Sequence, residues 1–236
     1  LAGDIPNGFV GDLVENETHS LREVVGAMRH WLGFAPAKCE IIIPKFAIGT
    51  MSEIADGLGK LGWRSPLRST AVKVLADGVT GVPADLSQFG VPPVKSFVQT
   101  LANMPARVED RQFARMALLT PIIIATLIVF WFLSGLIGFV SVNAAALVLE
   151  DIGWPRALAV ASVLFWAVID IAIAAAFAYR PYAKKACWCA IGVSLLYLTA
   201  STFFVPSLWF DPLGPMIKVL PSIVLALVAR IALETR

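Results

Sequence analysis

The sequence predicts a mainly α-helical protein in two parts: a small helix-rich α+β subdomain, expected in the cytoplasm, followed by a bundle of four transmembrane helices. Of the 236 residues, 58% are hydrophobic, whereas soluble domains contain about 45–50% apolar residues. The excess is uneven, because charged residues occur throughout residues 1–115 and long apolar runs fill residues 116–236. This asymmetry predicts two domains, a subdomain over residues 1–110 and a membrane domain over 116–236.

Four apolar segments follow one another in the second part. They cover residues 116–142, 155–179, 186–205 and 216–233. Each is close to the ~20 residues that a helix needs to cross about 30 Å of hydrocarbon. A buried helix of a soluble protein would explain any one of them, but four in succession with short connections indicate membrane spans. Residues 143–155, a short apolar run that ends in Gly-Trp-Pro, predict a short helix on the outer face.

Loop charges predict the orientation of the spans. Basic residues gather before the first span, after the second and at the end of the chain, at Arg107, Arg111, Arg115, Arg180, Lys184, Lys185, Arg230 and Arg236. Acidic residues follow the first and third spans, at Glu150, Asp151 and Asp211. Because basic loops stay in the cytoplasm, we expect four spans with both termini cytoplasmic. The net charge of +2 is too small to predict a nucleic acid partner.

Asp170 lies alone among apolar residues in the stretch VLFWAVIDIAIAAAF, residues 163–177. An ionised carboxylate without a partner is costly in hydrocarbon, so we expect it to be paired, protonated or beside water. Asp170 and Arg230 each lie about fifteen residues inward from the outer ends of their spans, which is roughly 20 Å at ~1.5 Å per residue. The sequence therefore predicts an Asp170–Arg230 pair, with Lys218, nearer the outer surface, as a secondary partner through water.

This predicted pair has a functional and a structural interpretation. It marks a proton or quinone site, or it is a buried ion pair that holds the bundle together. A third alternative is that Arg230 snorkels to the cytoplasmic face. The structural interpretation is favoured, since no other ionisable residue lies close in depth to complete a relay.

Helical periodicity dominates the first part. Ser20 and Glu23 form the spacing of a capping box at the start of one helix, and Gly33 ends it. The run KCEIIIP, residues 38–44, predicts a short strand. Further helices are expected over residues 45–62, 65–78 and 94–105, with a loop at 82–93 and Ser65 before Pro66 at the start of the third helix.

The motifs that would carry cofactor or metal chemistry are weak in this chain. Gly57–Gly62 fits G-x-G-x-x-G, but a dinucleotide fingerprint follows a strand and opens a helix, and here the pattern predicts a helix terminus. His19, His30 and three cysteines lack the spacing of a metal site, and an odd cysteine count with no framework spacing predicts no disulfide scaffold. We therefore expect no catalytic, cofactor-binding or metal-binding residue in the chain.

Two stretches resemble known families. The run LSQFGVPPVKSFVQTLANMP, residues 86–105, resembles the C-terminal substrate subdomain of atypical extended short-chain dehydrogenases. The run DPLGPMIKVLP at 211–221, the Gly-Trp-Pro at 153–155 and Asp170 resemble the DoxX-like family, a four-helix membrane domain found behind such dehydrogenases. The resemblance implies the membrane-anchored portion of an NAD(P)-dependent oxidoreductase in a bacterial inner membrane, with NAD(P) bound upstream of residue 1.

The dehydrogenase resemblance does not extend to catalysis. That family uses a Tyr-x-x-x-Lys pair, but Ala183, Ala186 and Ser201 stand four residues after the three tyrosines of this chain. Two alternatives stay open: a non-enzymatic four-helix membrane module with a cytoplasmic docking domain, and a small proton- or quinone-linked membrane protein centred on Asp170. The expected partners are the lipid bilayer, a quinone or membrane redox partner, and a second copy of the chain as a homo-oligomer.

Overall fold

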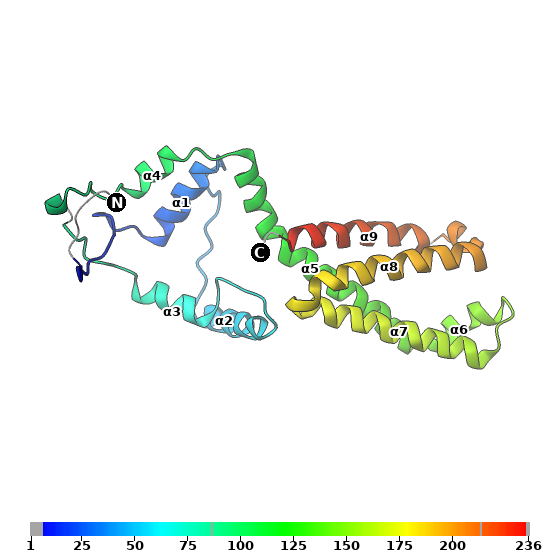
Figure 1. Cartoon of the computed structure of the whole chain (residues 1–236). Helices are drawn as coiled ribbons and strands as arrows, with labels where there is room; N and C mark the ends of the chain where they lie inside the picture. Colours follow the sequence, from blue (N-terminus) through cyan, green and yellow to red (C-terminus); the bar gives the residue numbers. More distant parts are fainter. Residues whose placement is uncertain (1–6, 86, 213, 235–236) are drawn as a thin grey trace. The chain divides into compact units, whose positions relative to one another are not determined.

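The computed structural model describes residues 7–85, 87–212 and 214–234, and this part of the chain is mainly helical (Figure 1). The α-helices in chain order are α1 (Leu21–Trp31), α2 (Lys45–Lys60), α3 (Ser69–Asp77), α4 (Phe97–Asn103), α5 (Val108–Val140), α6 (Val142–Glu150), α7 (Arg156–Ala178), α8 (Arg180–Phe204) and α9 (Pro215–Ala232). Two 3₁₀ turns, η1 (Ser87–Phe89) and η2 (Pro206–Phe210), complete the elements. The predicted mainly helical fold is confirmed.

The chain divides into two compact units. The first comprises the described residues of Leu1–Asp56 and Ser65–Arg115, and the second those of Gly57–Arg64 and Met116–Arg236. Two elements, α2 and α5, run from one unit into the other. The second unit therefore contains the membrane part and, in addition, a short segment from the first half of the sequence.

Capping interactions define the helices of the first unit. Ser20 accepts a hydrogen bond from the Glu23 amide at the start of α1, and the Glu23 carboxylate accepts one from the Ser20 amide in return. The hydrogen bonds that the Glu23 carboxylate accepts from the Ser20 amide and from the Ser20 hydroxyl hold the pKa of Glu23 below its usual range. Ser96 and Gln99 form the same reciprocal arrangement at the start of α4. The capping box predicted at Ser20 is confirmed, and α1 ends as predicted before Gly33, which has a φ of +70°.

Two local expectations in the first unit are wrong. Residues 38–44 form no strand, and the described chain contains only one isolated bridge, between Asp12 and Pro83. A strand needs a neighbour to satisfy its amide and carbonyl groups, and none is available, so Ile41 and Ile42 remain 83% and 93% exposed. The third helix begins at Ser69 rather than near Ser65.

Asp56 accounts for this later start of α3. Its carboxylate accepts hydrogen bonds from the Ser69 amide at 3.4 Å and from the Arg68 guanidinium at 3.2 Å. Hydrogen bonds from Ser69 and Arg68 lower the pKa of Asp56 below its usual range. The side chain of Asp56 thus fixes the first turn of α3 from a neighbouring helix, which periodicity alone does not reveal.

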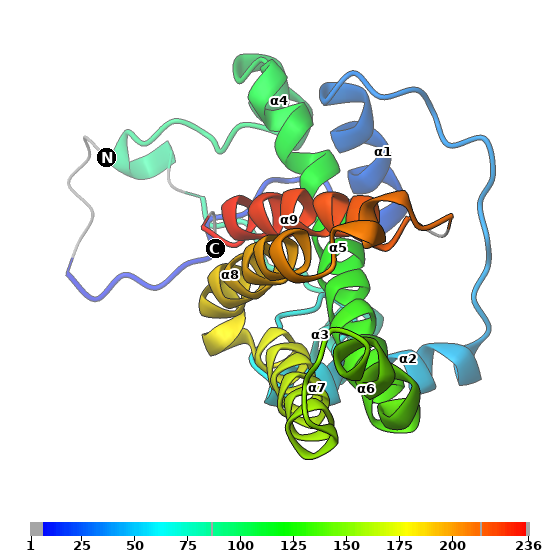
Figure 2. The same ribbon diagram turned by 90° about the vertical axis from the view of Figure 1, so that its right-hand side faces the viewer.

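Among the described residues, four helices are long and apolar enough to cross a membrane: α5, α7, α8 and α9 (Figure 2). They correspond to the four predicted spans, so the chain is an integral membrane protein. The third span is longer than expected, because α8 begins at Arg180 instead of residue 186. Pro181 opens that helix, and a proline is well tolerated in a first turn, where its missing amide hydrogen would have no partner. The segment 180–185, which contains Arg180, Lys184 and Lys185, is therefore helical.

The membrane helices pack through small residues and a few large apolar ones. The core cluster joins α5, α7, α8 and α9, with Leu127, Phe177 and Cys187 almost completely buried. Between α5 and α7, Gly135 and Gly138 face Ala167 closely enough that an added Cβ would touch it. Small-residue contacts of this kind let membrane helices approach one another. The predicted short helix between the first two spans is α6, and it packs on α7.

Candidate intramembrane pocket

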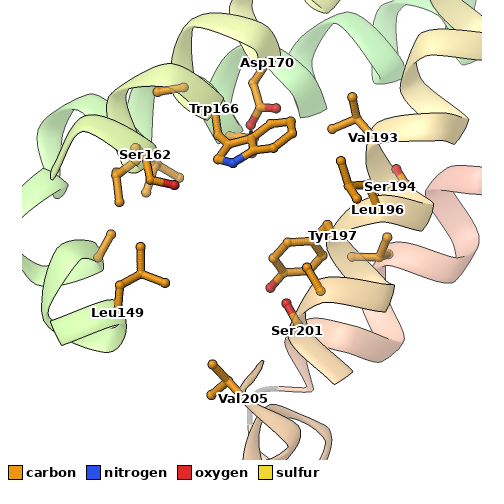
Figure 3. A pocket seen from close by; sticks show the side chains of 18 of the residues that line it. Leu149, Ser162, Trp166, Asp170, Val193, Ser194, Leu196, Tyr197, Ser201 and Val205 are labelled. Atoms are coloured by element: carbon orange, nitrogen blue, oxygen red, sulfur yellow. Dashed lines mark hydrogen bonds between the residues drawn. The ribbon is translucent and has the colours of Figure 1, made fainter. Parts of the chain in front are cut away.

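One face of α7 carries the polar residues of the candidate site. Ser162, Trp166 and Asp170 follow one another at intervals of four residues, so they share one side of the helix. Figure 3 shows Trp166 and Asp170 projecting from α7 toward residues of α8, including Val193 and Tyr197. The periodicity of an otherwise apolar span thus places a carboxyl group and an indole ring on the same surface.

Ser134 of α5 is the partner that the structure gives Asp170. The Ser134 hydroxyl donates a hydrogen bond of 2.6 Å to Oδ2 of Asp170. The carboxyl group therefore has a polar contact within the bundle, although most of its surroundings are apolar.

A cavity of about 710 Å³ opens beside this hydrogen bond. Ligand pockets usually measure about 300–1,000 Å³, so its size suits a small organic molecule. Its walls come from α5, α6, α7 and α8, with Val219 contributed by α9. Most of the lining is apolar or aromatic, as with Phe130, Trp154 and Phe204. The cavity is a mostly apolar space with a few polar groups, which is the usual composition of a ligand site.

Trp131, one of the lining residues, has an unused hydrogen-bond donor. Its side chain is only 4% exposed, and its Nε1 has no hydrogen-bond partner among the described residues. A buried indole N–H normally finds an acceptor, because an unpaired donor costs about 1–3 kcal/mol. Trp131 lines the same cavity as Asp170. One residue of the cavity wall therefore carries a buried donor for which the described chain provides no acceptor.

Further hydroxyl groups come from α8. Ser194, Tyr197 and Ser201 recur at intervals of three and four residues, and Figure 3 shows them on the cavity side of the helix. Sequence reasoning missed these residues, although the signal was present, since three hydroxyl groups on one face of an apolar span are unusual. It also missed Ser134, because a single serine in a long apolar run carries no pattern of its own.

The structure does not bring the predicted pair of Asp170 and Arg230 together. Arg230 instead forms an ion pair with Glu234, one turn further along the chain. Arg230 lies in the last turn of α9, whereas Asp170 lies about two turns before the end of α7. The last residues of α7 and α9 lie at the same level, since the Arg180 guanidinium donates to the Leu233 carbonyl. Because α9 has 18 residues and α7 has 23, equal counts from their outer ends do not give equal depths.

The other expected site residues lie outside the cavity. Lys218 is exposed near the start of α9 and does not line the cavity. Gly57–Gly62 is a helix terminus as predicted, since α2 ends at Lys60 and Gly62 adopts a φ of +87°. Within the described ranges, no group of three His, Cys, Asp or Glu residues could hold a metal ion.

The comparisons with known proteins bear on the same region. Residues 128–227 match the model of the DoxX-like family. The matched region begins within α5 and ends within α9, so it includes the lining residues of the cavity. A comparison with curated proteins and one with solved structures gave no match. The predicted DoxX-like resemblance is therefore confirmed for this region, and the likeness of the first part to short-chain dehydrogenases has no support from these comparisons.

Proposed function

We propose that the second unit is an intramembrane binding module for a small lipid-soluble molecule of the quinone class. The observation that supports this function most is the composition of the cavity: one mostly apolar space is lined by the hydrogen-bonded pair of Ser134 and Asp170 and by Trp131, whose buried indole N–H has no partner among the described residues. A structural core would fill such a space with side chains, since a void forfeits packing contacts.

The chemistry of a quinone fits these groups. Its ring is flat and apolar, so it can stack on Trp166 or Tyr197, which both line the cavity. Its carbonyl oxygens are hydrogen-bond acceptors, and the indole N–H of Trp131 is a donor that lacks one. Its tail is soluble in lipid and can remain in the bilayer around the four spans. In this proposal Asp170 accepts a hydrogen bond from a hydroxyl group of the reduced, quinol form, since Ser134 already donates its only proton to the carboxylate.

Photolabelling with an azido-quinone tests this function. The full chain is reconstituted in lipid nanodiscs, labelled, and digested for mass spectrometry. Label is expected on peptides that contain Trp166 or Tyr197, and decylubiquinone in excess should remove it. Trp131→Phe should weaken competition by decylubiquinone about fivefold, as expected for the loss of one hydrogen bond. Trp188→Phe is the matched control, because Trp188 is on α8, is 58% exposed and does not line the cavity.

Two results would contradict the proposal. Label spread over lipid-facing peptides without competition would mean that the probe only dissolves in the bilayer. Equal loss of competition in Trp131→Phe and Trp188→Phe would mean that tryptophan substitution perturbs the bundle in general. The variants Asp170→Asn and Ser134→Ala keep the aromatic lining of the cavity. Their effect on competition therefore measures the polar contact separately from the contact with the aromatic rings.

A second candidate function is membrane anchoring of an NAD(P)-dependent oxidoreductase by this bundle. The resemblance of residues 86–105 favours it. Within this stretch, the Phe97 amide donates a hydrogen bond to the Glu15 carboxylate near the start of the first unit. In this proposal NAD(P) binds to residues preceding residue 1. Sequencing the coding DNA upstream is the test. An in-frame glycine-rich turn and a Tyr-x-x-x-Lys pair would support it, whereas a start codon next to residue 1 would refute it.

A further inference from the structure

A cluster of basic and aromatic side chains lies at the junction of α7 and α8. We call it the α7–α8 corner, and it consists of Trp63, Tyr179, Arg180, Tyr182, Lys184 and Lys185. All of these residues belong to the second unit. The cluster is separate from the cavity, since none of its members lines it.

The backbone of the α7–α8 corner is tied in place from two sides. The Trp63 indole donates a hydrogen bond of 2.7 Å to the carbonyl oxygen of Ala178, and the Arg180 amide donates one of 2.9 Å to Leu61. The Arg180 guanidinium donates to the carbonyl of Leu233 at 3.3 Å. These bonds join the segment 57–64, the α7–α8 junction and the end of α9. Lys184 and Lys185, one turn further along α8, are thereby carried on a fixed base.

Aromatic rings lie beside two of the basic side chains of the corner. The Arg180 guanidinium lies 5.4 Å from the centre of the Trp63 ring, and the Lys185 ammonium lies 5.8 Å from that of Tyr182. The rings of Tyr179 and Tyr182 lie 5.6 Å apart. Tryptophan and tyrosine are typical of the boundary between hydrocarbon and water, where lipid headgroups lie. We therefore expect the positive charge of the corner to lie at headgroup level.

Among the described residues, the positive charge of Lys184 and Lys185 has no acidic partner. Neither lysine takes part in an ion pair among the described residues. Glu234 is an acidic residue at this end of the second unit, and it forms an ion pair with Arg230. At the opposite end, Arg156 is matched by Glu150. The charge of the lysines is thus available to an anion from the surroundings.

We propose that the α7–α8 corner binds the headgroup of an anionic phospholipid. Lys184 and Lys185 contact the phosphate, the tyrosine rings lie beside the glycerol region, and the acyl chains run along the apolar surfaces of α7 and α8. A lipid fits better than a dissolved anion, because the lysines lie at the start of a membrane span and their neighbours are interfacial aromatic residues. This inference does not depend on the function proposed for the cavity.

Native mass spectrometry of the full chain tests the inference. The protein is released from detergent micelles containing equal amounts of phosphatidylglycerol and phosphatidylcholine, and bound lipid is counted. We expect phosphatidylglycerol to be retained preferentially. Each basic residue near an anionic surface contributes on the order of fivefold in affinity, so Lys184→Gln with Lys185→Gln should reduce retention by about 20-fold. The double variant Lys184→Arg with Lys185→Arg keeps both charges, so it should retain phosphatidylglycerol as the unmodified chain does.

Lys218→Gln is the matched control. Lys218 is an exposed lysine near the start of α9, whereas the α7–α8 corner contacts the end of that helix. Its retention of phosphatidylglycerol should equal that of the unmodified chain. Equal retention of the two lipids, or an equal loss in Lys218→Gln, would overturn the inference. Displacement of the lipid by millimolar inorganic phosphate would also overturn it, because the corner would then be a simple anion site. If the double glutamine variant fails to fold, the two single glutamine variants make the same comparison, each with about a fivefold expected loss.

Discussion

The hydroxyl of Ser134 donates a 2.6 Å hydrogen bond to the carboxylate of Asp170 and so connects α5 with α7. The two residues lie 36 positions apart in the sequence. Their bond gives a polar side chain in a membrane span a partner on a different helix, and interhelical bonds of this kind contribute about 0.6–2 kcal/mol in membrane bundles.

We predict that Ser134→Ala destabilises the bundle by about 1 kcal/mol, because Asp170 then loses its donor. Asp170→Asn should cost less, since an amide still bonds with a hydroxyl. Thermal unfolding of the full chain in detergent measures both. Thr126→Ala is the control on the same helix, as its hydroxyl bonds only to the carbonyl of Ile122 within α5. An effect of Thr126→Ala as large as that of Ser134→Ala would contradict the interhelical role.

Gly135 provides a second, steric test of the same helix contact. A Cβ at Gly135 would lie 2.6 Å from the carbonyl oxygen of Ala167 and 2.7 Å from a side-chain carbon of Ile171. Both are closer than real Cβ contacts, so α5 and α7 must separate. We predict that Gly135→Ala lowers the unfolding temperature in detergent, with a loss of about 1–3 kcal/mol as in an overpacked core.

Gly192 is the matched control for this substitution. It also lies within a membrane span, but a Cβ there meets nothing within 4 Å. Alanine is a better helix former than glycine by about 0.8–1 kcal/mol, so Gly192→Ala should leave the unfolding temperature unchanged or raise it. If both substitutions lower it equally, the contact with Ala167 is not the cause.

The sequence predicted the fold well because the signals for membrane helices are local. Runs of apolar residues gave the four spans, and the capping pair of Ser20 and Glu23 gave the start of α1. The prediction of a strand at residues 38–44 was wrong, because a strand depends on a partner strand elsewhere in the chain. The start of α3 was misplaced for a similar reason, since it is fixed by Asp56 of a different helix.

The candidate site was predicted only in part. Asp170 stood out as a lone carboxylate, but its partner could not be read from depth, because α7 and α9 have different lengths. The choice between Arg230 and Ser134 depends on which helix faces α7 at that level, and this is a property of tertiary packing. Trp131 was equally hidden, since only its burial without a partner distinguishes it from an ordinary core tryptophan.

Trp63 offers a prediction for the segment of the first half that belongs to the second unit. Its indole hydrogen bond to Ala178 is a side-chain contact that ties residues 57–64 to α7. We predict that Trp63→Phe increases amide hydrogen exchange in this segment about fivefold, as expected for one lost hydrogen bond. Trp188→Phe should leave exchange there unchanged. Unchanged exchange in Trp63→Phe would mean that the Arg180 backbone bond to Leu61 is sufficient by itself.

The exposed Cys39 allows the predicted orientation of the chain to be tested directly. Cys39 lies in the first unit and Cys189 in α8, and both are exposed, whereas Cys187 is buried. In a Cys189→Ser background, a membrane-impermeant maleimide is added to intact cells and then to inverted membrane vesicles. Because basic residues predict that the first unit is cytoplasmic, labelling is expected in inverted vesicles only. Cys39→Ser should abolish the signal. Labelling in intact cells would mean that all four spans have the orientation opposite to the predicted one.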